Sequence, residues 1–218
     1  MMTQILNDQE RRKLDSRISE AEKVTGAQIV MAVVKRSDSY PEIPWKAFAV
    51  GVSVAGLMVC LLDLVFSTWM PRTTLLITAI SATFLVGILF ALLTIGITGL
   101  ARLFLTENRS QEEVRQYAES VFLDRGLFAT RQRTGILVLV SMFERQVIIL
   151  PDTGLQGFLS RETIEEIISA MAPILASGDV ARALEEGLRG LEKILAGKFK
   201  DDLPPNELSN EIIEEKGV

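Results

Sequence analysis

The stretch from Gly135 to Leu150, GILVLVSMFERQVIIL, decides the fold. It holds two runs of aliphatic and β-branched residues, GILVLVSM and QVIIL, with only Phe143, Glu144 and Arg145 between them. This spacing predicts two antiparallel strands joined by a short hairpin turn. The next four residues, Pro151-Asp152-Thr153-Gly154, predict the turn that leaves the second strand.

A third strand is predicted far upstream, at Gln28 to Val34 (QIVMAVV). This run is short and apolar throughout, which is typical of a strand buried on both faces. A single strand cannot bury a sheet by itself, so we expect it to pair with the strands between Gly135 and Leu150. The two halves of the chain would then form one domain.

Helix start and stop signals surround these strands. They are Asn7 with Glu10 before Gly26, Ser110 with Glu113 before Gly126, Ser160 before a helix to about Ala176, and Asp179 before a helix to Ala196.

The segment between the two halves is strongly apolar. Trp45 to Phe66 supplies about one membrane crossing at roughly 20 residues per span, and Trp45 and Trp69 flank it where aromatic rings favour the membrane interface. Thr73 to Leu105 is longer than a crossing needs, so we expect this helix to tilt or to project past Arg102. Asp63 lies near the loop, where solvation at the interface is expected.

Charges around the apolar segment predict its orientation. Six basic residues flank it and only Arg72 lies in its loop; the six are Lys35, Arg36, Lys46, Arg102, Arg109 and Arg115. The positive-inside rule therefore places both soluble halves in the cytoplasm, in a multi-pass protein of the cytoplasmic (inner) membrane.

Small residues recur along both apolar runs, at Gly51, Ala55, Ala79, Thr83, Gly87 and Ala91. They predict close packing within the hairpin or, as an alternative, a homo-oligomer. The domain prediction is then 1–44 and 106–199 for the two parts of one α/β domain. A transmembrane hairpin occupies 45–105, with spans at about 45–66 and 73–102, and a loosely held tail covers 200–218.

The run GLFATRQRTGILVLVSMFERQVIILPDTGL (Gly126 to Leu155), with EAEKVTGAQIVMAVVKRSDSY before the hairpin and GDVARALEEGLRGLEKILAGKF after it, resembles a TPM domain. The similarity is greatest to the bacterial membrane subgroup with a hairpin inserted after the first strand. The resemblance implies an α/β/α sandwich around a small mixed sheet. It also implies either acid-phosphatase-like activity with divalent metal binding, or a role in the assembly or repair of membrane complexes.

The chemistry open to the chain is narrow, because it contains no histidine. Candidate polar groups are Asp38, Ser39, Tyr40, Thr134 and Asp152. Asp38 and Asp152 follow predicted strands and could hold a hard cation, Ca²⁺ or Mg²⁺. The alternative for both acids is turn capping.

Arg131, Arg133 and Thr134 are the candidates for binding a ligand or phosphate. Soluble relatives commonly carry Asp-Asn where this chain has Arg133-Thr134, which weakens the transfer of a metal site. The alternative for the two arginines is contact with lipid head groups or a partner. For Glu144 and Arg145 we expect a solvated turn.

With a net charge of −5 and no basic cluster among aromatics, a nucleic-acid partner is excluded. Two functions remain. The first is a non-catalytic, membrane-anchored module in the lipid bilayer that interacts with another membrane protein or an assembly intermediate. The second is a divalent-metal-dependent phosphatase tethered to the membrane.

Overall fold

The parallel pairing of two distant strands forms the centre of the fold. In the computed structural model, which describes residues 5–65, 72–199, 212–215 and 217, β1 (Gln28–Val34) pairs in register with β2 (Gly135–Ser141). Every residue of both strands is buried, which explains why both sequences are apolar on both faces. The predicted pairing across the insertion is confirmed.

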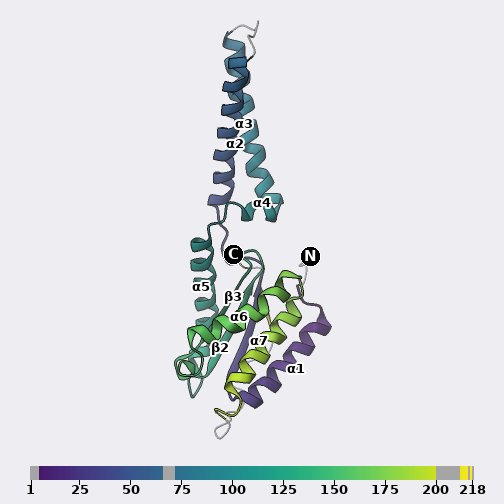
Figure 1. Ribbon diagram of the computed structural model, residues 1–218, viewed down its shortest axis with the longest axis vertical. Helices are drawn as coiled ribbons and strands as arrows, with labels where there is room; N and C mark the ends of the chain where they lie inside the picture. The colour runs from purple at the N-terminus through teal and green to yellow at the C-terminus, as the bar shows by residue number, and fades with distance from the viewer. Residues whose placement is uncertain (1–4, 66–71, 200–211, 216, 218) are drawn as a thin grey trace. The chain divides into compact units, whose positions relative to one another are not determined.

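Two further strands complete a mixed four-stranded sheet (Figure 1). β3 (Gln146–Pro151) runs antiparallel to β2, as the hairpin spacing predicts, and β4 (Ile213–Glu215) runs parallel to β1. The strand order is β3-β2-β1-β4. The sheet therefore has β3 at one edge and a strand of only three residues at the other.

β4 corrects the expectation that the whole tail is loosely held. Its acids bind elements on both faces of the sheet: Glu214 accepts a hydrogen bond from the Leu6 amide (2.9 Å), and Tyr117 donates one to Glu215. Burial and the hydrogen bond to Glu215 raise the pKa of Tyr117. These charge-assisted contacts hold a segment too short to be stable on its own.

Helices cover both faces of the sheet (Figure 1). α1 (Asp8–Thr25), α6 (Arg161–Ala176) and α7 (Val180–Leu195) pack on the face that carries Ile29, Val138 and Ile149. α5 (Glu107–Asp124) packs on the other face against Val30 and Leu139. Two short 3₁₀ helices, η1 (Leu127–Ala129) and η2 (Thr153–Leu155), lie in the connections. The α/β/α sandwich is confirmed.

Three of the four predicted helix starts are confirmed by cap geometry. Asn7 and Glu10 form a capping box, and Ser160 and Asp179 accept hydrogen bonds from amides of their own first turns. The fourth is wrong, because α5 begins three residues before Ser110. The Ser110 amide donates to the Thr106 carbonyl (3.0 Å), so Ser110 lies inside the helix instead of capping it.

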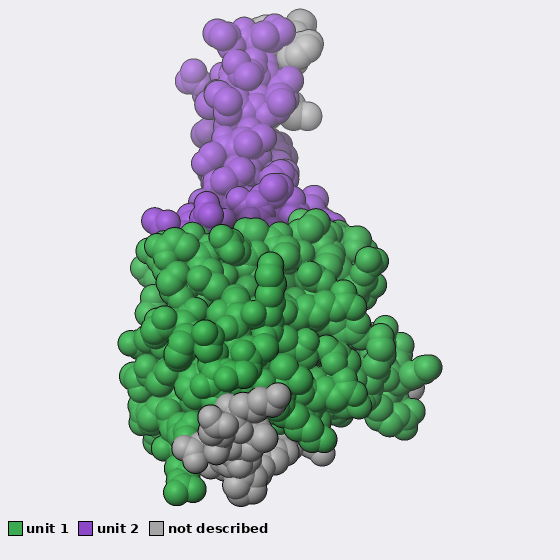
Figure 2. All heavy atoms as spheres, turned by 60° about the horizontal axis from the view of Figure 1, so that its bottom comes forward, with its two compact units in different colours: residues 1–38, 111–218 green, residues 39–110 purple. Residues whose placement is uncertain are grey.

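The chain divides into two compact units, coloured separately in Figure 2. The sheet unit comprises residues 1–38 and 111–218, and the inserted unit comprises residues 39–110. The units divide at 38/39 and 110/111, whereas the sequence expectation is 44/45 and 105/106.

The inserted unit contains two helices long and apolar enough to cross a membrane, α2 (Glu42–Val65) and α3 (Arg72–Gly96). Only 6% of the most apolar window of each is buried, whereas a core helix of a soluble protein is mostly buried. The helices approach closely where a Cβ added to Gly51 would lie 2.9 Å from the Gly87 Cα. Small residues therefore serve packing within this pair of helices.

The second apolar run does not continue as one helix past Arg102. α3 ends at Gly96, Ile97 adopts an extended conformation (φ −119°, ψ 99°), and a short helix α4 (Thr98–Arg102) follows. The expected tilt or projection of one long helix is thus replaced by a break. Trp45 is 72% exposed near the start of α2, and Trp69 lies outside the described residues.

Candidate functional site

Strand direction separates the two acids proposed as cation ligands. Asp38 follows the carboxyl end of β1, while Asp152 follows the carboxyl end of β3. Because β3 is antiparallel to β2, Pro151 pairs with Ile136 at the beginning of β2. Asp38 and Asp152 therefore lie at opposite ends of the sheet, separated by about 20 Å at roughly 3.3 Å per strand residue. This geometry argues against one cation held by both acids and leaves turn capping as the alternative for each.

The structure does bring Asp152 and Arg133 together. The Arg133 Nε lies 3.0 Å from Asp152 Oδ2, and the Asp152 side chain is only 4% exposed. Asp152 Oδ1 accepts a hydrogen bond from the Thr153 amide (2.7 Å) and so caps η2. The buried carboxylate is thus balanced by a guanidinium that is half exposed.

The loop that carries Arg133 is fixed by its own backbone. Arg133 has a left-handed conformation (φ 58°), and its carbonyl accepts a hydrogen bond from the Gly154 amide (3.0 Å). A Cβ at Gly154 would lie 2.4 Å from the Gln132 carbonyl oxygen, so glycine is required at this contact. The buried Thr134 donates its amide to Thr130 Oγ1 (3.0 Å).

These contacts decide what this end of the sheet can do chemically. A phosphate at Arg133 would have to compete with the Asp152 carboxylate for the same guanidinium. Arg131 is exposed in the same loop. The arrangement supports the turn-capping alternative for Asp152 over a ligand-binding role.

At the opposite end of the sheet, the structure reveals a buried polar cluster of Ser37, Ser141 and Glu144. The Glu144 carboxylate accepts hydrogen bonds from the Ser37 amide (3.0 Å) and from the Ser141 hydroxyl. The Ser37 hydroxyl donates to Ser141 Oγ (3.1 Å). Glu144 is only 8% exposed, so the expectation of a solvated turn is wrong for this residue.

The cluster ties the β2–β3 turn to the segment that leaves β1. The Phe143 amide donates to the Lys35 carbonyl (2.9 Å), and the Arg36 guanidinium lies 4.5 Å from the centre of the Phe143 ring. The hydroxyl groups are buried and hydrogen-bonded. These contacts therefore fix the β2–β3 turn to the segment that follows β1. The two buried serines are not exposed to solvent as nucleophiles.

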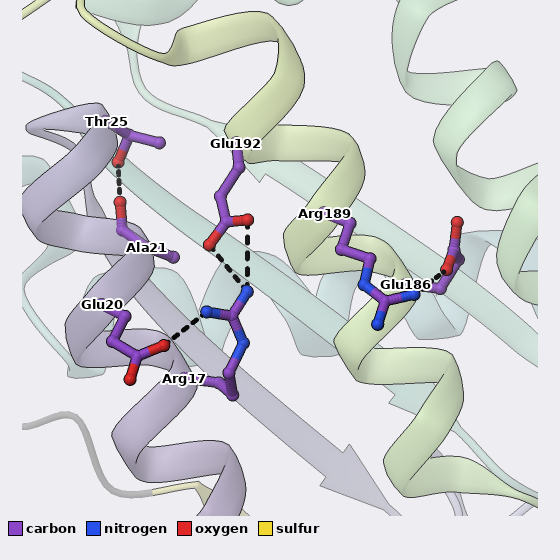
Figure 3. A network of polar contacts seen from close by, with 7 residues as sticks. All are labelled: Arg17, Glu20, Ala21, Thr25, Glu186, Arg189 and Glu192. Carbon is purple, nitrogen blue, oxygen red and sulfur yellow. Dashed lines mark hydrogen bonds and ion pairs between the residues drawn. The ribbon is translucent and has the colours of Figure 1, made fainter.

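A second polar network joins α1 to α7 (Figure 3). The Arg17 guanidinium donates to Glu20 (2.5 Å) and to Glu192 (2.9 Å), which raises the pKa of Arg17, chiefly through the hydrogen bond to Glu20. Nearby on α7, Arg189 pairs with Glu186 (3.4 Å). Of these pairs, only Arg17–Glu192 joins the two helices, because Arg17–Glu20 lies within α1 and Arg189–Glu186 lies within α7.

Two further features of the described part of the chain bear on ligand binding. There, no three His, Cys, Asp or Glu side chains come together in a group that could hold a metal ion. A groove of about 510 Å³ runs between α6 and α7, lined by apolar residues such as Phe158 and Ile167 and by charged residues of both signs. The charged residues of its lining are Glu166, Glu186, Arg189 and Lys193.

Comparisons with known proteins agree with this architecture. Residues 98–194 match the family model of the TPM domain. The NMR structure of the BA42 protein from the psychrophilic bacterium Bizionia argentinensis is similar over 99% of both chains, with a TM-score of 0.56 and 16% sequence identity. At this identity the likeness shows the fold alone. No curated protein matches the chain.

The contact between Asp152 and Arg133 predicts a measurable coupling. Asp152→Asn should lower the free energy of unfolding by about 0.5–2 kcal/mol, because the Arg133 charge loses its buried partner. Arg133→Gln should couple to it in a double-mutant cycle, measured by urea unfolding of the full chain in detergent and followed by circular dichroism. A coupling below about 0.3 kcal/mol would show that the pair contributes nothing to the fold.

Proposed function

Because this chain carries a TPM domain, we propose that it is a membrane-anchored, non-catalytic module that binds another membrane protein or an assembly intermediate. The observation that carries the proposal is the Asp152–Arg133 contact. The best candidates for ligand chemistry bind each other and cap a turn, while Asp38 lies at the far end of the sheet. The domain is then a rigid scaffold that binds its partner through its surface.

Anchoring is supported by the exposed apolar surface of α2 and α3. Side chains such as Leu64 (83% exposed) and Leu85 (65% exposed) would be costly in water and favourable in lipid. Both ends of the inserted unit connect to the sheet unit, so both parts of that unit lie on one side of the bilayer. The excess of flanking basic residues over Arg72 supports a cytoplasmic location for that side.

The alternative function is a metal-dependent phosphatase, favoured by exposed Arg131 and half-exposed Arg133 at one loop. A thermal melt of the purified full chain with Ca²⁺ or Mg²⁺ separates the two functions. A ligand at 100 times its Kd stabilises the fold by about 2.7 kcal/mol, so binding would be visible. We expect no shift and no hydrolysis of p-nitrophenyl phosphate. Hydrolysis that requires the cation and is lost in Arg133→Gln would establish the phosphatase instead.

The interaction function itself is tested by crosslinking in intact membranes, followed by purification of the full chain. We expect a defined membrane protein to be crosslinked to the wild-type chain. Recovery of the chain alone, across crosslinkers of different lengths, would contradict an interaction module.

The proposed orientation is tested by cysteine labelling in a Cys60→Ser background. Thr73→Cys, at the start of α3, should react in intact cells with a thiol reagent that cannot cross the membrane. Lys193→Cys, on α7, should react only after the cells are opened. The reverse labelling pattern would place the sheet unit outside the cytoplasm.

A further inference from the structure

The two edge strands of the sheet, β4 and β3, differ in length and in the charge of their side chains. At one edge, β4 is three residues long, and its acids Glu214 and Glu215 are bound to Arg11 and Tyr117. A short, charged strand of this kind closes an edge against further pairing. At the other edge, β3 carries four consecutive apolar residues, Val147 to Leu150. Among the described residues, no strand pairs with its outer side.

The hydrogen-bonding directions along β3 follow from its register. The Asp152 amide donates to the Gly135 carbonyl (2.8 Å), and bonding alternates along an antiparallel pair. Ile148 and Leu150 therefore direct their backbone groups to β2, whereas Val147 and Ile149 direct theirs outward. Pro151 also faces outward but has no N–H to satisfy. The edge presents two donors and several carbonyls in the plane of the sheet, which only another extended backbone matches.

The residues around the outer edge of β3 indicate which kind of polypeptide segment could bind there. Val147, Ile148 and Leu150 are partly exposed, so an added strand with apolar side chains would bury them further. Arg145 is exposed at the beginning of β3 and forms no ion pair among the described residues. At the other end, Arg133 is already paired with Asp152. Arg145 therefore favours an acid at the end of the incoming segment that lies beside it.

We propose that the outer edge of β3 binds an extended segment of another polypeptide chain, apolar in its middle and acidic at the end beside Arg145, by strand addition. The proposal rests on the interaction function above and names the class of partner. A second copy of this chain fits less well as the partner. If two β3 strands paired antiparallel, the two sheets would run in opposite directions. Residue 38, which leads into the inserted unit, would then lie at opposite ends of the joined sheet in the two copies.

The test is amide hydrogen exchange in the full chain in detergent, read by NMR, with the probe peptide Glu-Val-Thr-Val-Thr-Val-Glu. In the free protein, the amides of Val147 and Ile149 should exchange faster than those of Ile148 and Leu150. The peptide should slow exchange at Val147 and Ile149 by at least about tenfold. Two control peptides carry N-methyl groups on alternate sets of residues, and only the set that faces β3 should abolish binding.

Protein variants distinguish a loss of peptide binding at the outer edge of β3 from a loss of stability of the fold. Val147→Pro removes an outward donor and should abolish peptide binding with the β2–β3 pairing retained. Ile148→Pro is the matched control, because it removes an inward donor and should destabilise the sheet. Arg145→Glu keeps every backbone group and should weaken peptide binding by charge repulsion at the strand end.

Three results would overturn the proposal: protection of Val147 and Ile149 in the free monomer, no change on adding peptide, or concentration-dependent protection with dimer formation. The last would assign the edge to self-association. If the partner crosslinked in membranes still binds the Val147→Pro and Arg145→Glu variants, the interaction function stands and the β3 site falls.

Discussion

The parallel pairing of β1 with β2 is the constraint on which the rest of the structure depends. Each strand is buried along its whole length, so neither is stable without the other and the helices on both faces. Parallel neighbours need a crossover, and α5 provides it across one face. The inserted unit lies within this crossover. Its two ends must therefore return to one domain, as a pair of helices such as α2 and α3 allows.

The polar groups at the two ends of the sheet maintain this arrangement. Glu144 holds the segment that leaves β1, and Asp152 with Arg133 holds the loop that enters β2. In the described part of the chain, the buried acids at these loops already have partners. A domain built in this way offers rigid edges and surfaces more readily than reactive groups. The proposed function therefore concerns binding, and its most specific form concerns the outer edge of β3, which has no partner strand among the described residues.

Much of this fold could be predicted from the sequence, because its signals are local. The strands β1, β2 and β3 are continuous apolar runs in the sequence, and caps at Asn7, Ser160 and Asp179 mark helix starts. β4 could not be found, since three residues in a polar tail show no periodicity and are held by distant side chains. The burial of Glu144 was equally hidden, because it depends on Ser37, more than a hundred positions away. The separation of Asp38 from Asp152 follows from two strand directions together. The hairpin spacing places Asp152 beside the start of β2, and the parallel pairing of β1 with β2 places Asp38 at the opposite end.

The central claim, that one sheet is assembled from both sides of the insertion, is tested most directly by disulfide trapping in a Cys60→Ser background. Ala32 pairs with Leu139, and both side chains lie on the face covered by α5. The pair Ala32→Cys and Leu139→Cys should crosslink readily on mild oxidation of the full chain. Ala32→Cys with Val138→Cys should not, because a shift of one residue moves the second cysteine to the opposite face. Equal crosslinking of both pairs, or of neither, would contradict the account.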